Sequence, residues 1–333
     1  MVSRKVLGPG IWLCLLLFAC GEEKKLAAPT PPPGPVAVTV ALNWYPEPEF
    51  GGMYMAREKG LYKDAGLDVT IQTGGPGAPV TTEVATAKVQ FGVVTGDEVV
   101  LGRAAGADLR AIFATFQIHP QAIMVHQSRG LKDLGELKSG TLALESGPPF
   151  ATWLIKKFGF EGVTRVPYDG NLTRFVSEKD YAIQCYETFE PHLAKSQGAD
   201  VMLFRVADTG YNPYANVVIT SDALIQTSPQ VVQKFVTATR KGWELYLSDP
   251  AVANEAIIQA NPTLARDLLD YAANAQKALI QTEDTTKGGL GIMSEERWGI
   301  LTNQLKELGI VTGSVSPADV YTNRFLSSPP TPQ

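Results

Sequence analysis

The sequence predicts an α/β protein of two lobes with a cleft between them, each lobe holding a mixed, mostly parallel sheet flanked by helices. Strand-like and helix-like runs alternate from residue 36 to residue 119, and the alternation repeats from residue 120 to residue 220. After residue 221 the pattern becomes helical. Strands that alternate with helices indicate βαβ units. We therefore assign residues 37–119 and 221–326 to lobe 1 and residues 120–220 to lobe 2.

The first alternation begins with a β-rich run at 36–44. The pattern then predicts, in order, a helix around 51–59, a strand at 67–72, a Gly-rich loop at 73–79, a helix that reaches residue 88, a strand at 89–94, a helix at 98–105 and a strand at 109–116. The run at 89–94 is mostly apolar, which is typical of a buried strand in a parallel sheet.

The second alternation and the helical return are predicted in the same way. Strands are expected at 122–127, 141–145, 164–169, 181–186, 201–206 and 215–220, and helices at 149–158, 172–178 and 190–197. Ser228-Pro229 begins a long helix, because proline fits the first turn and apolar residues then recur on one face. The segments 251–280 and 294–308 are also helical in pattern.

The chain opens with the features of an exported lipoprotein. A short basic start precedes an apolar run at 11–18, which is too short to span a bilayer. Residues 1–19 are therefore expected to be a signal peptide. Leu17-Phe18-Ala19-Cys20 resembles a bacterial lipobox, and this resemblance implies that Cys20 becomes the acylated first residue. The alternative is an ordinary signal peptide with an incidental cysteine.

The segments at the two ends of the mature chain are not expected to fold. Residues 20–36 are charged and then Pro-rich, which suits a semi-extended tether, and residues 327–333 are expected to be disordered. Apart from the signal peptide, no apolar stretch is long enough to cross a membrane. The lipid on Cys20 would therefore be the membrane anchor, on the periplasmic face if the host is Gram-negative.

The composition argues against several functional classes. The 34 acidic residues outnumber the 29 basic ones, and the basic residues form no cluster, so nucleic acid is not an expected partner. Hydrophobic residues make up 44% of the chain, as in ordinary globular proteins. Of the three cysteines only Cys185 would remain free after lipidation, which leaves no intramolecular disulfide.

Catalytic motifs are missing from the sequence. His119, His126 and His192 stand alone without metal-ligand spacing, and no GxSxG motif marks a serine nucleophile. Cys185 ends an apolar strand pattern, as a buried structural thiol does. The loop at 73–79 lacks the Lys-Ser/Thr of a phosphate-binding loop; it can present N–H groups to an anion or polar ligand, or form a plain turn. We predict no catalytic residue, no metal, no cofactor and no enzymatic activity.

A family resemblance lies at the start of the mature domain. Residues 41–69 contain Asn43-Trp44-Tyr45-Pro46, then Gly60-Leu61-Tyr62, then Gly66-Leu67-Asp68-Val69. This spacing resembles the first motif of the pyrimidine-precursor-binding (ThiY-type) proteins of ABC importers, which are related to the sulfonate-binding SsuA proteins. Residues 182–195, 207–250 and 288–298 resemble segments of riboflavin-binding, RibY-like members. The resemblance covers residues 37–326.

The resemblance implies a fold and a set of partners. The fold would be the two-lobed periplasmic binding protein fold of type II, with a small-molecule ligand enclosed in the cleft. The partners would be the permease and ATPase subunits of an importer, and the protein itself would be a monomer. Closure of two lobes around a ligand is a common signal in such systems.

Three candidate ligand contacts lie in lobe 1. Trp44 follows the first strand, where α/β sheets place ligands, and its indole can stack on a planar ring. A core tryptophan is the alternative. Asn43 can supply a donor and an acceptor to a pyrimidine edge. Asp97 follows the strand at 89–94, and is either a ligand contact or a helix N-cap.

The other candidates lie in lobe 2 and the return crossover. Glu145 and Ser146 occupy a strand-to-helix turn. Tyr186 and Glu190 come from the RibY-like segment, where a carboxylate such as Glu190 would accept from a ring N–H or an amine. Glu190 can instead cap the helix that begins beside Pro191. Tyr211 is expected to be a cleft wall or a hinge residue.

The function that these residues favour is capture of a planar nitrogen heterocycle, either a thiamine pyrimidine precursor or a riboflavin-like molecule. Small residues after the strand at 89–94 leave room for a ring larger than a pyrimidine. A sulfonate, taurine or nitrate binder of the SsuA type is the alternative, but it would need basic groups. An enzyme like the fungal pyrimidine synthases, which resemble this fold, is a further alternative; it would need a lysine for pyridoxal phosphate and a Cys/His cluster for iron.

Overall fold

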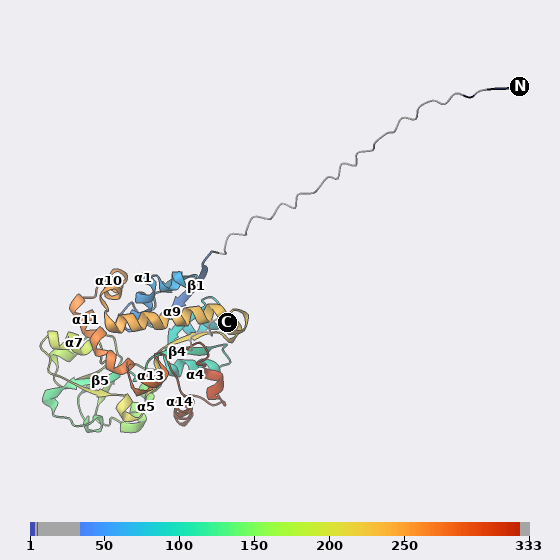
Figure 1. Cartoon of the computed structure of the whole chain (residues 1–333). Helices are drawn as coiled ribbons and strands as arrows, with labels where there is room; N and C mark the ends of the chain where they lie inside the picture. Colours follow the sequence, from blue (N-terminus) through green and yellow to red (C-terminus); the bar gives the residue numbers. More distant parts are fainter. Residues whose placement is uncertain (4, 6–33, 327–333) are drawn as a thin grey trace. The chain divides into compact units, whose positions relative to one another are not determined.

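The computed structural model describes residues 1–3, 5 and 34–326 (Figure 1). The chain divides into two units after residue 34, and every element named below lies in the second. The expected signal peptide (1–19), its lipidated Cys20 and the tail at 327–333 lie almost wholly outside the described residues, as does most of the tether at 20–36. Those predictions therefore stay predictions. Among the described helices, none combines the length and apolarity needed to cross a membrane.

Two five-stranded sheets form the framework. The first has the strand order β2-β1-β3-β10-β4 and the second has the order β7-β6-β8-β5-β9. The strands of the first sheet are β1 (Val36–Ala41), β2 (Leu67–Gln72), β3 (Phe91–Val94), β4 (Arg110–Phe116) and β10 (Ala215–Thr220). Those of the second are β5 (Gln121–His126), β6 (Thr141–Ala143), β7 (Thr164–Val166), β8 (Tyr181–Tyr186) and β9 (Val201–Arg205).

Each sheet is mixed, and the two follow the same plan. In the first sheet β1 pairs in parallel with β2 and β3, whereas β10 is antiparallel to β3 and β4. In the second, β6 pairs in parallel with β7 and β8, and β5 is antiparallel to β8 and β9. One antiparallel strand thus enters each sheet from the other lobe, and the α/β prediction of two mostly parallel sheets is confirmed.

The chain passes twice between the sheets, at residues 117–120 and 206–214. Our lobe boundary at residue 220 was wrong by one strand, because β10 pairs in the first sheet and not in the second. Sequence pattern alone cannot separate these assignments, since β10 is buried at all six positions and would read as a core strand in either sheet.

Helices cover both sheets, and most coincide with the predicted segments. They are α1 (Gly51–Glu58), α2 (Leu61–Asp64), α3 (Val80–Ala85), α4 (Gly96–Ala104), α5 (Pro149–Phe158), α6 (Thr173–Ser177), α7 (Glu190–Ser196), α8 (Asp222–Thr227), α9 (Pro229–Ser248), α10 (Ala251–Ala260), α11 (Arg266–Ala275), α12 (Lys277–Ile280), α13 (Glu283–Gly288), α14 (Glu295–Glu307) and α15 (Pro317–Val320). The unpredicted helices α2, α8, α13 and α15 have six residues or fewer, too few for a periodic pattern.

Helix α9 holds lobe 1 together. It lies beside α1 in Figure 1, and a Cβ atom at Gly242 would stand only 2.1 Å from the carbonyl oxygen of Gly52. Glycine at 242 therefore allows the two helices to touch along their backbones. Phe235 of α9 stacks on Phe91 of β3 with ring centroids 3.9 Å apart. The predicted apolar face of this helix is thus the face that packs on the sheet.

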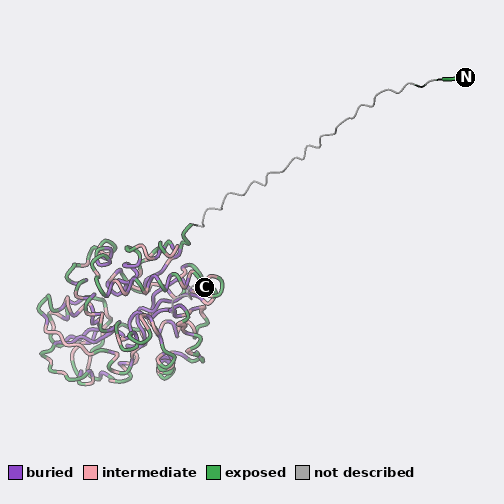
Figure 2. Tube along the Cα trace, viewed as in Figure 1, coloured by how far each residue is buried: buried purple, intermediate pink, exposed green. Residues whose placement is uncertain are grey.

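An apolar cluster joins the two lobes through the crossovers. It runs from Val94 and Val217 of the first sheet, past the fully buried Tyr211, to Ile123 and Leu154 of lobe 2. The central strands β3, β5, β8 and β10 are almost wholly buried, whereas the edge strands β2, β7 and β9 have exposed or half-buried positions (Figure 2). The two lobes therefore share one continuous apolar core near the crossovers.

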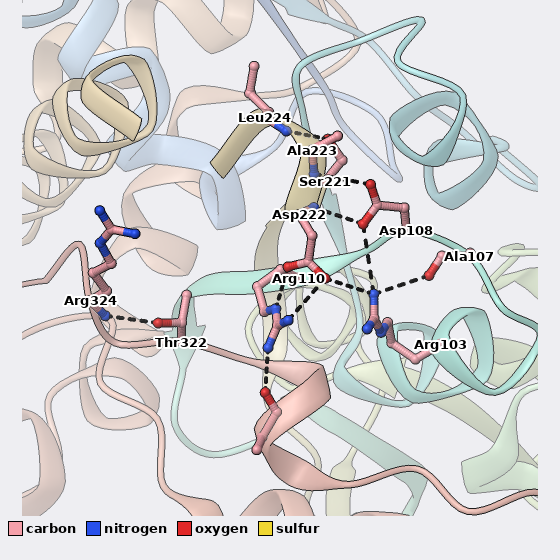
Figure 3. Close-up of polar contacts among 11 residues, drawn as sticks. Arg103, Ala107, Asp108, Arg110, Ser221, Asp222, Ala223, Leu224, Thr322 and Arg324 are labelled. Carbon is pink, nitrogen blue, oxygen red and sulfur yellow. Dashed lines mark hydrogen bonds and ion pairs between the residues drawn. The ribbon is translucent and has the colours of Figure 1, made fainter. Parts of the chain in front are cut away.

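Ion pairs stabilise the far end of the first sheet (Figure 3). Asp222 at the start of α8 accepts from Arg110 of β4 at 2.7 and 2.9 Å and from Arg103 of α4 at 3.1 Å. Arg110 also donates to the carbonyl of Ala318, so the network fastens the C-terminal segment to β4. These groups are partly buried, which makes their pairing stronger than that of fully exposed charges. The network lies at the amino end of β4, whereas the chain leaves for lobe 2 from its carboxyl end.

Candidate functional site

The predicted site residues follow the carboxyl ends of parallel strands in both sheets. Asn43 and Trp44 follow β1, Asp97 follows β3, Glu145 follows β6, and Tyr186 ends β8. In open α/β sheets this edge is where ligands bind. The candidates therefore lie at the carboxyl edges of both sheets, and the electrostatic effects described below connect groups of the two lobes.

Trp44 is partly buried and packs against the core of lobe 1. Its indole N–H donates to the carboxyl group of Glu47, and its ring meets the edge of Tyr45 with centroids 5.4 Å apart. The amide oxygen of the neighbouring Asn43 is buried and has no protein donor in the described chain. A buried acceptor without a partner costs free energy unless another molecule donates to it. Asn43 therefore offers a hydrogen-bond acceptor beside the indole.

Two carboxyl groups that the sequence analysis did not single out lie next to Trp44. Glu47 and Glu49 come from Pro46-Glu47-Pro48-Glu49, which leads through a short 3₁₀ turn (Pro48–Phe50) into α1. Burial raises the pKa of Glu49 to about 8, and the charge of Glu190 in lobe 2 adds to this. Burial also raises the pKa of Glu47, as do the charges of Glu49 and Glu190. The charge of Glu190 in lobe 2 therefore raises the pKa of both carboxyl groups in lobe 1.

Asp97 is buried and is tied to the return crossover. It accepts from the hydroxyl of Tyr211 at 2.9 Å, from the Thr95 hydroxyl and from the backbone N–H of Glu98. The N-cap of α4 is Thr95, which forms a capping box with Glu98, so Asp97 is not the cap we considered. Burial raises the pKa of Asp97, and its hydrogen bonds oppose the rise. The hydrogen bond from Tyr211 thus joins the second crossover to the loop after β3, and its role as a cleft wall or a hinge residue stays a prediction.

Tyr186 lies where the two lobes meet. Burial raises the pKa of its hydroxyl well above the usual range, and four carboxylates raise it further: Glu49, Asp97 and Glu98 from lobe 1, and Glu190 from lobe 2. The charges of both lobes thus act on the same hydroxyl group, which supports a single site at the junction of the lobes.

Glu190 is held by two tight hydrogen bonds at the start of α7. Its carboxylate accepts from the hydroxyl of Tyr168 at 2.9 Å and from the backbone N–H of Tyr186 at 2.8 Å. Burial raises its pKa, whereas these hydrogen bonds lower it. Glu190 is the first residue of the helix and does not act as its N-cap, which is Phe189. The alternative of a simple helix cap is therefore wrong.

Glu145 and Ser146 lie at the margin of the site. Both are exposed. The backbone N–H of Glu145 donates to Gln184 at 2.6 Å, and its carboxylate accepts from the same side chain at 3.3 Å. Its charge raises the pKa of Glu98 across the cleft. Nothing in the structure brings Ser146 to the other candidates.

A buried histidine, His119, packs against the ring of Tyr186. His119 lies in the first crossover, is buried, and meets the Tyr186 ring edge-on with centroids 6.0 Å apart. Burial lowers its pKa to about 3, and the nearby Arg297 contributes. Its backbone N–H donates to Asn212 of the second crossover at 2.9 Å, so the two crossovers are joined directly beneath the site.

The site is rich in carboxylates and poor in cations. None of Glu47, Glu49, Asp97, Glu98 and Glu190 has an ion-pair partner within 4.0 Å in residues 34–326. Burial is the main reason that the pKa values of these five carboxyl groups rise, and like charges add to the rise for Glu47, Glu49 and Glu98. The arrangement can accept hydrogen bonds from N–H groups and can hold a positive charge; it is poorly suited to an anion.

Metal-ligand geometry is not found in the part of the chain that the structure describes, where no three His, Cys, Asp or Glu side chains could hold an ion together. Cys185 is buried inside lobe 2 next to Phe175 and Ile183, and burial raises the pKa of its thiol. His126 is also a core residue, bonded to Asp200 and to the carbonyl of Phe175 at 2.6 Å each. Both side chains are thus buried in lobe 2.

We expect the thermal stability of the ligand-free protein to fall as pH rises from 6.5 to 8. In the folded protein Glu49 has a pKa of about 8, so it keeps its proton through most of this pH window. In the unfolded chain its pKa is near the ordinary value of 4.5, so the proton is already lost. The folded state therefore binds more protons than the unfolded state, and its stability falls as pH rises. His119 has the opposite effect, but only below its ordinary value of 6.5. One proton corresponds to about 1.4 kcal/mol per pH unit. In calorimetric scans Glu49→Gln should flatten the slope, and unchanged slopes would contradict the assignment.

The residues that sequence analysis missed are Glu47, Glu49, Glu98, Tyr168 and His119. A signal for the first two was present: acidic residues alternating with prolines directly after Trp44. No local signal marks Tyr168 or His119, because one lies after a short edge strand and the other in a crossover. Their proximity depends on how the lobes pack.

Comparison with known proteins decides the family. The NMT1/THI5-like family model matches residues 47–253, more than half of the chain. The chain belongs to the NMT1/THI5-like family. The match includes Glu47, Glu49, Asp97, Tyr186 and Glu190, so most of the site lies within the family region.

Members of known function fall into two groups. The riboflavin-binding protein RibY of Chloroflexus aurantiacus is 27% identical, over 98% of this chain and 99% of that protein. A 4-amino-5-hydroxymethyl-2-methylpyrimidine phosphate synthase of Aspergillus parasiticus is 23% identical, over 87% of each chain. This NMT1/THI5-like protein is thus similar over its whole length to a binding protein and, at lower identity, to synthases.

Solved structures show the same fold. The aliphatic sulphonate binding protein SsuA of Escherichia coli superposes with a TM-score of 0.66 at 12% identity, covering 86% of this chain and 92% of that one. A periplasmic sulfonate-binding protein from Methylobacillus flagellatus gives 0.65 at 13% identity, with 88% and 93% covered. The predicted two-lobed periplasmic binding protein fold is therefore confirmed.

Proposed function

We propose that this protein is the substrate-binding component of an ABC importer, and that it encloses a planar nitrogen heterocycle between its lobes for delivery to a permease and its ATPase. The observation that carries the proposal is the convergence of Trp44 and Glu47 from lobe 1 with Tyr186 and Glu190 from lobe 2. Aromatic faces suit a flat ring, and carboxylates suit its N–H groups.

The acidic character of the cleft favours a heterocycle over a sulfonate. Glu190 has no ion-pair partner among the described residues, so an anionic ligand would meet an unpaired carboxylate in the cleft. An aminopyrimidine or a flavin instead brings N–H donors and acceptors to such groups. The full-length similarity to a riboflavin-binding protein supports the same class. Sulfonate, taurine or nitrate binding is thus the less favoured alternative.

A pyrimidine synthase is the second candidate, because synthases occur among the relatives. An enzyme of that kind would need a lysine amine for pyridoxal phosphate and a Cys/His cluster for iron. In residues 34–326 the carboxylates of the cleft receive no hydrogen bond from a lysine, and Cys185 is enclosed in the core of lobe 2. The residues present fit capture better than synthesis. Absorbance of a bound pyridoxal group in the purified protein would favour the synthase.

The proposed function includes the lipid anchor. Acylation at Cys20 would hold the binding unit at the membrane, and the Pro-rich residues 20–36 would act as its tether. A monomer on a tether of this length can reach a permease in the same membrane. Mass spectrometry of the N-terminal peptide tests the anchor directly: a lipid-modified Cys20 is expected, and an unmodified peptide starting elsewhere would refute it.

A ligand panel tests the proposal. Hydroxymethylpyrimidine, formylaminopyrimidine, thiamine, riboflavin, taurine, an alkanesulfonate and nitrate are added separately to the purified protein, and thermal unfolding is followed. A ligand at 100 times its Kd should stabilise the folded state by about 2.7 kcal/mol. We expect at least one heterocycle to do so. Stabilisation by the sulfonate, taurine or nitrate alone would show that the heterocycle assignment is wrong.

A further inference from the structure

Beside Trp44 the structure contains a hollow that the proposed function does not use. It holds about 430 Å³ and lies at the carboxyl ends of β1 and β2. We call it the rim hollow. Its lining includes Tyr45, Gln72, Glu83 and the loop at 73–79. Most of this lining is the Gly-rich loop that sequence analysis left undecided between a plain turn and a ligand-facing loop.

The rim hollow adjoins the heterocycle site through two neighbouring aromatic rings. Trp44 is partly buried, whereas Tyr45 is 47% exposed and lines the hollow, and the two rings meet at 66°. The loop is fixed against the same segment, because the N–H of Gly74 donates to the carbonyl of Trp44 at 3.1 Å. A Cβ atom at Gly74 would stand 2.0 Å from the Leu42 carbonyl, so only glycine allows this approach.

The charges in the rim hollow cancel. Glu83 is buried, and its two carboxylate oxygens accept from Lys88 at 2.5 Å and from Gln72 at 2.8 Å. The hydrogen bond from Lys88 lowers the pKa of Glu83, so the pair remains ionised and balanced. The hollow therefore offers no net charge that would attract an anionic or a cationic group, in contrast to the acidic cleft beside it.

Uncharged donors and acceptors remain available there. The backbone N–H groups of Gly75 and Gly77 and the hydroxyl of Thr73 have no hydrogen-bond partner within residues 34–326, and the phenol of Tyr45 faces the same space. Hydroxyl groups both donate and accept, so a hydroxylated chain can satisfy such a mixed surface. A purely apolar substituent would leave these groups without partners.

We infer that the rim hollow is a subsite for an uncharged, hydroxyl-bearing chain attached to the ring that lies on Trp44. The inference rests on the proposed function, since the ring must first occupy the cleft. It narrows the substrate class from planar heterocycles in general to heterocycles that carry a polyol chain. A bare pyrimidine would fill the cleft and leave the hollow to water.

Riboflavin and lumiflavin form the matched pair of probes, because they share the isoalloxazine ring and differ in that only riboflavin carries the ribityl chain. Their Kd values are measured by flavin fluorescence quenching on the full mature protein. We expect riboflavin to bind the wild type at least tenfold more tightly than lumiflavin. In Tyr45→Ala this ratio should fall toward one, and Tyr45→Phe should give an intermediate ratio. Ile300→Ala, an exposed apolar change on α14, should leave the ratio unchanged.

The outcomes separate the subsite from the proposed function. Equal affinity of the wild type for the two flavins would overturn the subsite while leaving heterocycle capture intact. If the protein binds pyrimidines but neither flavin, the subsite is likewise overturned and heterocycle capture still stands. If no heterocycle of the panel binds, the proposed function fails and the subsite falls with it. Since Tyr45 is exposed, its variants are expected to fold, and an unchanged melting temperature verifies this.

Discussion

Replacing Trp44 by alanine is expected to weaken heterocycle binding about 100-fold. Stacking of one ring on an aromatic side chain contributes about 1–3 kcal/mol, which corresponds to a factor of about 10–100. The substitution also removes the indole N–H that donates to Glu47, so that carboxyl group loses a hydrogen bond that holds it in place. Fluorescence or calorimetric titration with the best ligand of the panel provides the measurement.

A conservative variant separates stacking from packing. Trp44→Phe keeps an aromatic face but cannot donate to Glu47, so it should retain most of the affinity that Trp44→Ala loses. Trp44 also packs against the core of lobe 1, and both variants are therefore compared at a temperature well below their melting points. If Trp44→Ala binds the heterocycle as well as the wild type does, Trp44 is only a packing residue.

Replacing Glu190 by glutamine is expected to raise the Kd for an N–H-bearing heterocycle about fivefold. Glutamine can keep the local structure, because its oxygen can accept from the N–H of Tyr186 while its amide donates to the hydroxyl of Tyr168. The change therefore removes the charge with little loss of packing. Hydrogen bonds to charged acceptors are about twice as strong as neutral ones, a difference of about 1 kcal/mol, which corresponds to a factor of about five in Kd.

The matched control for this variant lies at the edge of the site. Glu145→Gln makes the same chemical change at an exposed carboxylate and should alter the Kd less than threefold. The ligand-free Glu190→Gln protein should also be more stable at pH 8 than the wild type, since one of the facing negative charges is gone. Equal losses of affinity in both variants would show that the overall acidity of the cleft, and not Glu190, determines binding.

Much of the fold was predictable from sequence because its strands and helices are strongly patterned. The run at 67–72 is a strand with these bounds, and the long helix from Pro229 buries the face that its apolar spacing indicates. The placement of β10 was not predictable. The sequence of a strand that is buried on both faces does not indicate which sheet the strand joins. Only the pairing of β10 with β3 and β4 assigns it to the first sheet.

The site was partly predictable for a similar reason. Residues that follow parallel strands, such as Trp44, Asp97 and Tyr186, are brought to one edge by topology alone. The facing of Glu49 and Glu190 is different, because it arises from the packing of two lobes that are distant in sequence. Ser146 shows the opposite error: it follows a strand end but remains exposed, away from the other candidates.

The central claim is that one ligand is enclosed by both lobes, and hydrogen exchange measured by mass spectrometry tests it most directly. The account predicts that a saturating heterocycle slows exchange in two segments together, residues 44–50 of lobe 1 and residues 186–190 of lobe 2, while α10 and α14 remain unchanged. Protection of only one of these segments, or protection by a sulfonate but by no heterocycle, would contradict it.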